Sequence, residues 1–278
     1  IKEKFQVTSI SSKKPSKTRL IKKIRYRHCN IKNFNELKKS TNIDFDYVVN
    51  LGGYVNHKNK KKTYDSHFLG VKNLYKVFKD KSIKAFIQIG SSSEYGNSRS
   101  PLKEKSLCNP LMIYGRSKLM ATNFLLNQYK LNSFPVTILR FFQIYGPTQK
   151  PNRLIPIVIN SSLKNKKFKC SDGEQLRDFL YIDDAIEAIF KSLRNNKIRG
   201  SIINIGRGEP TKVKKIILQI IDIIKKGTPL FGKIKLRVDE PKIVFPDVNY
   251  AKKTLNWSSR VSINKGLFKT IKYYKKNI

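Results

Sequence analysis

Residues 85–96 read AFIQIGSSSEYG, an apolar run that ends in glycine and serine. A short run with Ile and Phe, bounded by small residues, is typical of a buried strand, so we predict a strand over Ala85–Ser91. Small residues after a strand let a ligand approach the backbone closely. Four other segments have the same apolar, partly β-branched character and predict further strands: residues 5–10, 45–51, 136–141 and 202–205.

Amphipathic segments lie between and after these strands. Apolar residues recur at helical spacing in four places: Leu74, Val77 and Phe78; Leu119, Leu126 and Tyr129; Ala185, Ile186, Ile189 and Leu193; and Val213, Ile216, Ile217, Ile220 and Ile224. Strands that alternate with helices at this spacing predict one parallel sheet with right-handed crossovers. The expected fold class is therefore α/β with a doubly wound sheet, which binds ligands beyond the carboxyl ends of its strands.

The composition narrows the classes of function. The 278 residues carry a net charge of +39, but Lys outnumbers Arg by 45 to 13, and Arg is the residue favoured for bidentate recognition of phosphate. Since no zinc-finger or RNA-binding signature occurs, we interpret the charge as a lysine-rich surface and expect no nucleic-acid partner. No apolar run reaches the ~18–20 residues that cross a bilayer. Three widely spaced cysteines predict neither disulfides nor a metal site, and we expect a cytoplasmic protein.

One pair of residues carries a chemical signal. Tyr114 and Lys118 are four residues apart at the start of a predicted helix, so they share a face. A nearby ammonium favours the tyrosinate, and we expect the pKa of Tyr114 to fall below its usual value of about 10. Such a phenol can take a proton from a hydroxyl group. The same spacing occurs in two other pairs, which we interpret as structural: Tyr54 with Lys58, and Tyr75 with Lys79.

Several motifs occur in a fixed order along the chain. The principal ones are GSSSEYG at 90–96, YGRSK at 114–118, LRFFQIYGP at 139–147 and DGEQLRDFLYIDD at 172–184, with Asn109-Pro110, Asn204–Gly206 and Leu255–Trp257 as further matches. This set covers nearly the whole chain and resembles the extended short-chain dehydrogenase/reductases, in their NAD-dependent epimerase/dehydratase branch. The resemblance implies a Rossmann-like NAD(P)-binding domain over residues 1–147, completed by about 179–206. It implies that residues 148–278 are mainly a smaller substrate-binding lobe.

The resemblance also implies catalytic roles. Tyr114 is the acid/base, and Lys118 hydrogen-bonds the nicotinamide ribose and tunes Tyr114. A serine bonds the reacting sugar oxygen, and counting along the motif favours Ser92, with the serines on either side of it as alternatives. Glu94 resembles the glutamate that acts as a second acid/base in GDP-mannose dehydratase-like members; its alternative is an ordinary turn residue.

Two further residues match substrate-binding positions of the family. Arg177 matches the residue that grips the diphosphate of a nucleotide sugar, where a guanidinium fork suits two phosphates. Its alternative is a structural ion pair with Asp178 or Asp183. Gln143 stands where many members have an Asn that contacts substrate. The resemblance thus implies a nucleotide-diphosphate sugar as substrate, no metal, no membrane partner and a homodimer.

The cofactor side departs from the family pattern. No glycine-rich turn of the form G-x-x-G-x-x-G occurs, so residues 5–10 match the second strand of the fold. We therefore expect that about 25–30 residues, one strand and helix, are missing before residue 1 and that the fragment is inactive as given. Ser11 and Lys13 follow that strand in place of the acidic residue that bonds the ribose of NAD. Hydroxyl and ammonium groups suit a 2′-phosphate, which favours NADP, with ordinary surface lysines as the alternative.

Four more residues complete the expected cofactor site. Asn30 stands where the family often has an Asp near the adenine, and an amide can still hydrogen-bond there. Leu51, Gly52 and Gly53 end the next strand beside the cofactor. The implied activity is that of a nucleotide-sugar epimerase or dehydratase, which oxidises a sugar carbon transiently and then returns the hydride. A keto-sugar reductase that uses NADPH and a non-catalytic cofactor-binding regulator stay open as alternatives. The serine motif is one residue shorter than usual before Tyr95, which limits the reach of Glu94 and slightly favours the epimerase.

Overall fold

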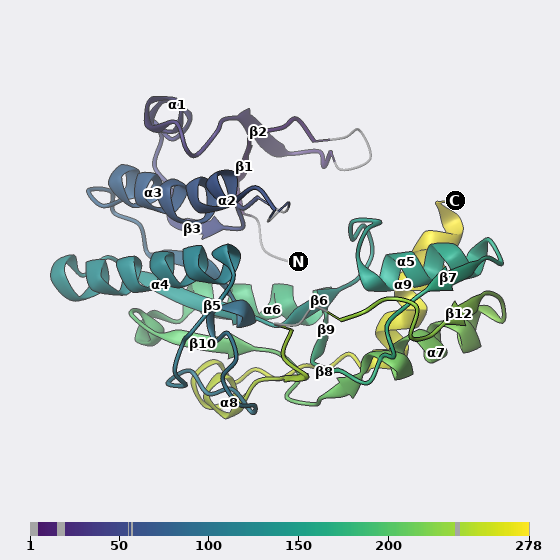
Figure 1. Cartoon of the computed structure of the whole chain (residues 1–278). Helices are drawn as coiled ribbons and strands as arrows, with labels where there is room; N and C mark the ends of the chain where they lie inside the picture. Colours follow the sequence, from purple (N-terminus) through teal and green to yellow (C-terminus); the bar gives the residue numbers. More distant parts are fainter. Residues whose placement is uncertain (1–4, 16–19, 55, 57, 237–239, 278) are drawn as a thin grey trace.

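A four-stranded parallel sheet forms the centre of the molecule (Figure 1). The computed structural model describes residues 5–15, 20–54, 56, 58–236 and 240–277. The sheet has the order β10-β5-β4-β3, with β3 at Tyr47–Asn50, β4 at Ala85–Ser91, β5 at Val136–Phe141 and β10 at Ile202–Ile205. Four of the five predicted strands are thereby confirmed as neighbours in one parallel sheet.

The fifth predicted strand lies in a different sheet. β1 (Val7–Ser11) pairs in parallel with β2 (Ile24–His28), and these two form a separate two-stranded sheet. The expectation of a single sheet with all five strands was therefore wrong for this segment. The sequence IRYRH of β2 gave no strand signal, because charged residues interrupt its apolar ones and the strand is only partly buried.

Helices cover both faces of the four-stranded sheet, which confirms the doubly wound arrangement. One face carries α3 (Gly70–Phe78) and α4 (Ile113–Asn132), with α1 (Phe34–Ser40) packed on α3 and α2 (Lys60–Tyr64) packed on α4. The other face carries α6 (Ile182–Arg194) and α8 (Asn249–Leu255). Alternate side chains of each strand serve the two faces: Phe86 and Ile138 pack under α3 and α4, whereas Ile87 and Leu139 pack under α6.

The buried face of α4 differs from the predicted one. Of the three residues expected to face the core, Leu126 is half-buried against it, Leu119 is half-buried and Tyr129 is exposed. The buried positions of this helix are Gly115, Ser117, Lys118, Ala121, Thr122 and Leu125. The apolar residues of α4 do not mark its buried face, because the helix buries polar side chains that belong to the site described below. In α7 (Val213–Ile224), where no such demand exists, all five predicted core positions are buried.

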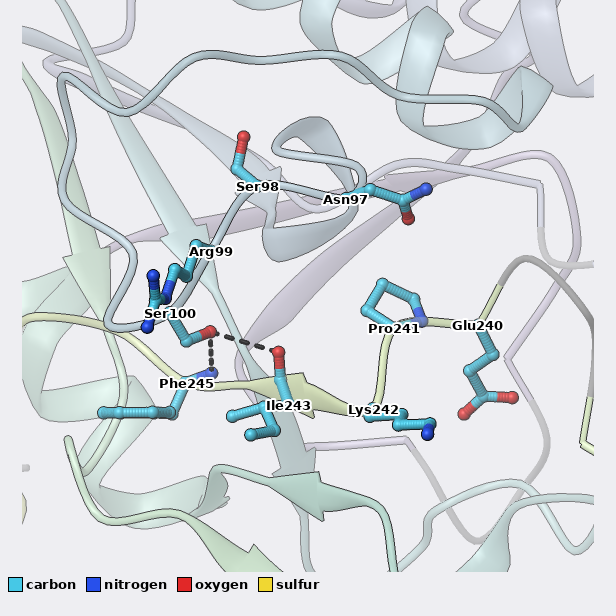
Figure 2. A pocket seen from close by; sticks show the side chains of 9 residues that line it. All are labelled: Asn97, Ser98, Arg99, Ser100, Glu240, Pro241, Lys242, Ile243 and Phe245. Carbon is cyan, nitrogen blue, oxygen red and sulfur yellow. Dashed lines mark hydrogen bonds between the residues drawn. The ribbon is translucent and has the colours of Figure 1, made fainter.

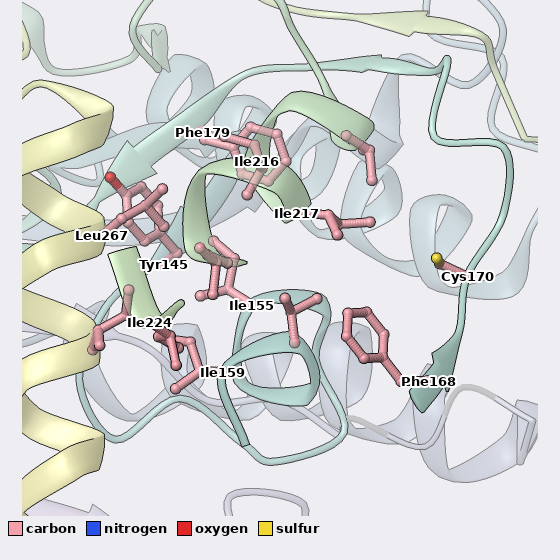
Figure 3. Close-up of a cluster of buried hydrophobic side chains, with 14 of the residues drawn as sticks. Tyr145, Ile155, Ile159, Phe168, Cys170, Phe179, Ile216, Ile217, Ile224 and Leu267 are labelled. Carbon is pink, nitrogen blue, oxygen red and sulfur yellow. The ribbon is translucent and has the colours of Figure 1, made fainter. Parts of the chain in front are cut away.

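A second group of helices forms a smaller lobe beside the sheet, with α5 (Leu154–Leu163), α7 and α9 (Ile263–Lys276) around one apolar cluster (Figures 1 and 3). Ile159, Ile216 and Leu267 are fully buried there, and each such side chain contributes roughly 1.5–3 kcal/mol. Short strand groups accompany these helices: β6 (Gln143–Tyr145) with β9 (Phe179–Tyr181); β7 (Lys167–Lys169) with β12 (Thr228–Leu230); and β8 (Leu176–Arg177) with β11 (Thr211–Lys212) and β13 (Ile243–Val244).

The C-terminal part of the chain is shared between the two cores. Ala251, Leu255 and Trp257 pack with the sheet cluster, whereas Leu267 and Ile271 pack in the lobe. All three cysteines are free thiols. No helix in the described ranges is long and apolar enough to cross a membrane. Within the same ranges, no three His, Cys, Asp or Glu side chains are grouped to hold a metal ion.

Candidate active site

Adjacent parallel strands bring their carboxyl ends to one edge of the sheet. Leu51–Tyr54 follows β3, and a short 3-10 turn, η3 (Ser92–Glu94), follows β4. The start of α4 packs on this turn. A Cβ atom at Gly115 would lie 2.3 Å from the carbonyl oxygen of Ser93, so only glycine allows the helix to approach so closely. The first turn of α4 therefore lies against the serine-rich end of β4.

Two predicted residues meet at this contact, and a third lies one helical turn away. The Ser91 and Tyr114 hydroxyl groups form a hydrogen bond. Lys118 lies one helical turn further along α4, with its side chain buried, and its ammonium donates a hydrogen bond to the carbonyl oxygen of Ile89 at 2.7 Å. The serine that contacts Tyr114 is thus Ser91, not Ser92, which counting along the motif had favoured. Counting could not reveal that the chain turns directly after Ser91 to enter η3.

The titration behaviour of this group differs from the expected one. The pKa of Tyr114 is raised above its ordinary value, chiefly by burial and also by the charge of Glu94, while the hydrogen bond with Ser91 and the charge of Arg153 lower it. The predicted depression of this pKa by Lys118 was wrong for the structure. Burial lowers the pKa of Lys118 to about 8, and the attraction of Glu94 offsets only part of that effect.

Glu94 is fully buried and both of its carboxylate oxygens are engaged. Oε1 accepts a hydrogen bond from the Ser91 backbone N–H at 2.8 Å. Oε2 accepts one from the Thr122 hydroxyl and one from Nε of Arg140, each at 2.9 Å. Arg140 is itself 1% exposed, and its guanidinium lies 4.5 Å from the centre of the Tyr95 ring. Through these hydrogen bonds Glu94 anchors the turn that carries Ser91.

Arg177 is buried on β8 and already has an acidic partner. Its Nη2 donates to Oε1 of Glu240 at 2.6 Å, and its Nη1 donates to two backbone carbonyls. The acid is neither Asp178 nor Asp183, the two that the sequence suggested. Asp178 instead accepts hydrogen bonds from backbone N–H groups, and burial raises its pKa to about 6.

A hollow of about 510 Å³ lies beside this ion pair (Figure 2). Glu240 lines it together with the cationic side chains of Arg99 and Lys242. The Ser100 hydroxyl, which also lines the hollow, donates to the carbonyl of Ile243 and accepts from the N–H of Phe245, each at 3.2 Å. The hollow therefore offers positive charge at the junction of the β4 loop and the β8–β13 strands. Gln143, at the start of β6, is exposed outside this lining.

The expected cofactor residues lie on several strand ends. β1 and β2 end in register at Ser11 and His28, with Ser11 and Lys13 exposed. The Ser11 hydroxyl donates to the carbonyl oxygen of Lys13. Asn30 lies just beyond β2, and its side-chain oxygen accepts a hydrogen bond from the Lys32 N–H.

The loop after β3 supplies the remaining candidates. Leu51 is 71% exposed, an unusual environment for a large apolar side chain, and Gly52 and Gly53 beside it are exposed as well. These residues follow β3, the neighbour of β4, and the Ile89 carbonyl of β4 binds the Lys118 ammonium. Exposed apolar and glycine residues at such a strand end suit the nicotinamide-ribose end of a dinucleotide. A glycine-rich turn for the pyrophosphate does not occur in the 278 residues.

Two residues at the site were missed by the sequence reasoning. Arg140 is the cation that neutralises Glu94. His67 is buried against the ring of Tyr114, with ring centroids 5.0 Å apart. The sequence offered one usable signal for each: Arg is the one charged residue in the apolar strand segment 136–141, and His is rare in this chain, with three in all.

Comparisons with known proteins identify the family of the chain. A family model described as the NAD dependent epimerase/dehydratase family matches residues 1–206. The chain is 30% identical to UDP-glucuronate 4-epimerase of Thermodesulfobacterium geofontis, with 88% of this chain and 83% of that protein covered.

Two solved structures extend the comparison. UDP-glucuronic acid 4-epimerase from Bacillus cereus, in complex with UDP-glucuronic acid and NAD, is similar with a TM-score of 0.85 and 29% identity, covering 94% of this chain and 84% of that one. UDP-glucose 4-epimerase from Thermotoga maritima, with UDP-glucose, has a TM-score of 0.92 over 98% of this chain and 92% of that one. At 21% identity it shows the likeness of fold.

Proposed function

The chain belongs to the NAD-dependent epimerase/dehydratase family, and from this premise we propose that it is a nucleotide-sugar 4-epimerase. The observation that carries the proposal is the interaction of Ser91 with Tyr114 at the carboxyl edge of the sheet, one helical turn from the buried Lys118. Such a group can remove a hydroxyl proton from a sugar and later return it. The relatives named above act on UDP-sugars, which supports a uridine diphosphate sugar as the substrate.

Each residue of the group has a distinct task in this proposal. Tyr114 takes the proton of the sugar hydroxyl as the carbon is oxidised, and gives it back when the carbonyl is reduced. Ser91 holds the sugar oxygen beside the phenol, so that the proton moves over one short hydrogen bond. When bound, a nicotinamide cofactor would supply the transfer of hydride from the sugar carbon and back to it. Lys118 would hold its ribose.

The raised pKa of Tyr114 fits its proposed role as the group that transfers the proton. Burial makes the phenolate costly, so Tyr114 holds its proton until a further positive charge comes near. An oxidised nicotinamide ring carries such a charge.

The position of Glu94 favours epimerisation over dehydration. Loss of water from the sugar needs a second acid/base, whereas inversion at C4 needs only Tyr114 and rotation of the keto-sugar. Both oxygens of Glu94 are engaged with Ser91, Thr122 and Arg140, so Glu94 does not supply that second group.

Substrate and cofactor specificity rest on residues at the two ends of the site. We propose that the substrate diphosphate displaces Glu240 from Arg177, with Arg99 and Lys242 nearby. We further propose that Ser11 and Lys13 favour NADP, with Leu51–Gly53 beside the nicotinamide ribose and Asn30 near the adenine. The homodimer implied by the resemblance stays a prediction, which light scattering can test.

The experiment supplies the protein with nicotinamide cofactor and UDP-glucuronic acid or UDP-glucose deuterated at C4. Proton NMR then follows the sugar. An epimerase inverts C4, retains the deuterium within the same molecule and consumes no cofactor. A keto-sugar reductase acting in reverse on this alcohol would reduce oxidised cofactor in equal amount and move the deuterium onto it, and a dehydratase would yield a deoxy-keto sugar, so either result would contradict the proposal.

Two tyrosine variants complete the test. Tyr114→Phe should lower kcat by about 10²–10⁴-fold, as expected for a general acid/base. The control is Tyr75→Phe, since Tyr75 has the same spacing to a lysine but packs in the core with its hydroxyl bonded to Asn132. The control should turn over at the wild-type rate. Normal activity in Tyr114→Phe would overturn the mechanism.

A further inference from the structure

A π-helical turn interrupts the helix between α2 and α3. This turn, η2 (Asp65–Leu69), is closed by a hydrogen bond from the Gly70 N–H to the carbonyl of Asp65, five residues back. Single π turns inside α-helices are rare and frequently occur at functional sites. His67 stands at the middle of the turn and is 5% exposed. The widened turn thus presents one buried imidazole to its surroundings.

The imidazole of His67 touches the acid/base directly. Its ring meets the ring of Tyr114 edge to face, with centroids 5.0 Å apart and an interplanar angle of 79°. Aromatic pairs prefer this geometry, which restrains the orientation of both rings. The orientation of the Tyr114 phenol therefore depends on His67 as well as on the hydrogen bond with Ser91.

The same imidazole touches the loop that follows β3. Its Nε2 lies 3.2 Å from the backbone nitrogen of Tyr54 and 3.0 Å from the carbonyl oxygen of the same residue. A Cβ atom at Gly53 would lie 2.3 Å from Cε1 of His67, so glycine is required for the ring to fit here. One side chain thus lies in contact with both the glycine loop and Tyr114.

We propose that His67 is a positioning residue that joins the loop Gly52–Tyr54 to the Tyr114 ring. This inference rests on the proposed function, in which the loop lies beside the cofactor and Tyr114 transfers the proton. Nε2 fixes the loop through Tyr54, and the ring fixes the phenol. The two contacts are made by different parts of one side chain, so substitution can separate them.

Two variants separate the contacts. His67→Phe keeps an aromatic ring against Tyr114 but removes Nε2. His67→Gln places an amide within reach of the Tyr54 backbone but removes the ring. The first measurement is hydrogen exchange of the Tyr54 amide, which requires neither cofactor nor substrate. It should accelerate roughly tenfold in His67→Phe, as expected for one lost hydrogen bond, and His67→Gln should restore most of the protection.

The second measurement compares the effects of the two variants on kcat and on KM for the cofactor. His67→Phe should raise KM for the cofactor with little change in kcat, whereas His67→Gln should lower kcat with little change in KM. Unchanged exchange of the Tyr54 amide in both variants would overturn the proposal, and so would equal effects of both variants on kcat and KM. A wild-type protein that converts the nucleotide sugar without inversion at C4 would refute the proposed function instead, and the exchange result would still decide the role of His67.

Discussion

The buried ion pair between Glu94 and Arg140 offers the sharpest test of how the site is held. Glu94→Gln keeps the shape of the side chain but replaces the carboxylate with a neutral amide. Arg140, at 1% exposure, then retains a positive charge without the carboxylate that neutralises it. The amide also offers only one oxygen to the three donors that the carboxylate serves, from Ser91, Thr122 and Arg140.

The expected cost follows from this burial. Removal of one partner of a buried ion pair costs about 3–5 kcal/mol, because the other charge is left uncompensated in a medium of low polarity. A matched control is Glu187→Gln, since Glu187 is partly exposed and lies 3.7 Å from Lys191 in an i,i+4 pair. Pairs of that kind contribute only about 0.3–0.5 kcal/mol.

Urea unfolding provides the assay. The chain has one tryptophan, Trp257, which is buried and donates its indole N–H to the carbonyl of Asp184, so its fluorescence reports on unfolding. The double variant Glu94→Gln/Arg140→Met should recover part of the loss, because it also removes the stranded charge. A loss below about 1 kcal/mol in Glu94→Gln, with product formation abolished, would refute the reasoning and return Glu94 to the role of acid/base.

Three further predictions address other parts of the molecule. The pKa of Lys118 is about 8 in the folded protein and 10.5 ordinarily, so between pH 8 and pH 10.5 the unfolded chain binds more protons than the folded one. The free energy of unfolding should therefore rise by ~1.4 kcal/mol per pH unit in this range. Urea unfolding measures this rise, and Lys118→Met should abolish it. Gly96→Ala, with φ +62° and a Cβ position 1.9 Å from the Asn109 carbonyl oxygen, should cost ~1–3 kcal/mol more than Gly232→Ala, with φ +74° and open space, when their melting curves are compared. Arg177→Met should weaken the binding of UDP, measured by calorimetry, by about 10–100-fold. Glu240→Gln should strengthen this binding several-fold, because Glu240 is the ion-pair partner of Arg177. The control Glu174→Gln, at an exposed pair with Lys212, should leave the binding unchanged.

The sequence predicted those parts of the fold in which apolar pattern and burial coincide. β4, β5 and β10 and the core face of α7 were found because apolar side chains alone decide their burial. β2 and the buried face of α4 were not found, because polar side chains fill positions that the pattern reserves for apolar ones. The pattern fails in α4 at the turns that carry Lys118 and Thr122, which is where the site needs polar groups.

The sequence predicted which residues belong to the candidate site but not which residues they contact. The motif identified Tyr114, Lys118 and a serine, yet the choice between Ser91 and Ser92 depends on where the strand ends and η3 begins. The partner of Arg177 is Glu240, which lies 63 residues away in sequence. Contacts over such distances depend on the packing of β13 against β8, and no local spacing encodes them.

The buried polar network connects the stability of the sheet with the geometry of the proposed chemistry. Lys118 is buried at a cost that its hydrogen bond to Ile89 and the nearby charge of Glu94 only partly offset, as the low pKa of its ammonium indicates. Glu94 in turn holds the backbone of Ser91 and neutralises Arg140, so one carboxylate serves the strand end, the helix and the core. A substitution within this network should therefore change stability and turnover together. Most lysines of this basic chain lie at its surface, where a single charge contributes little to stability. If a conservative change at Glu94 altered turnover while the free energy of unfolding stayed at the wild-type value, the two properties would be separable, and this account of the network would fail.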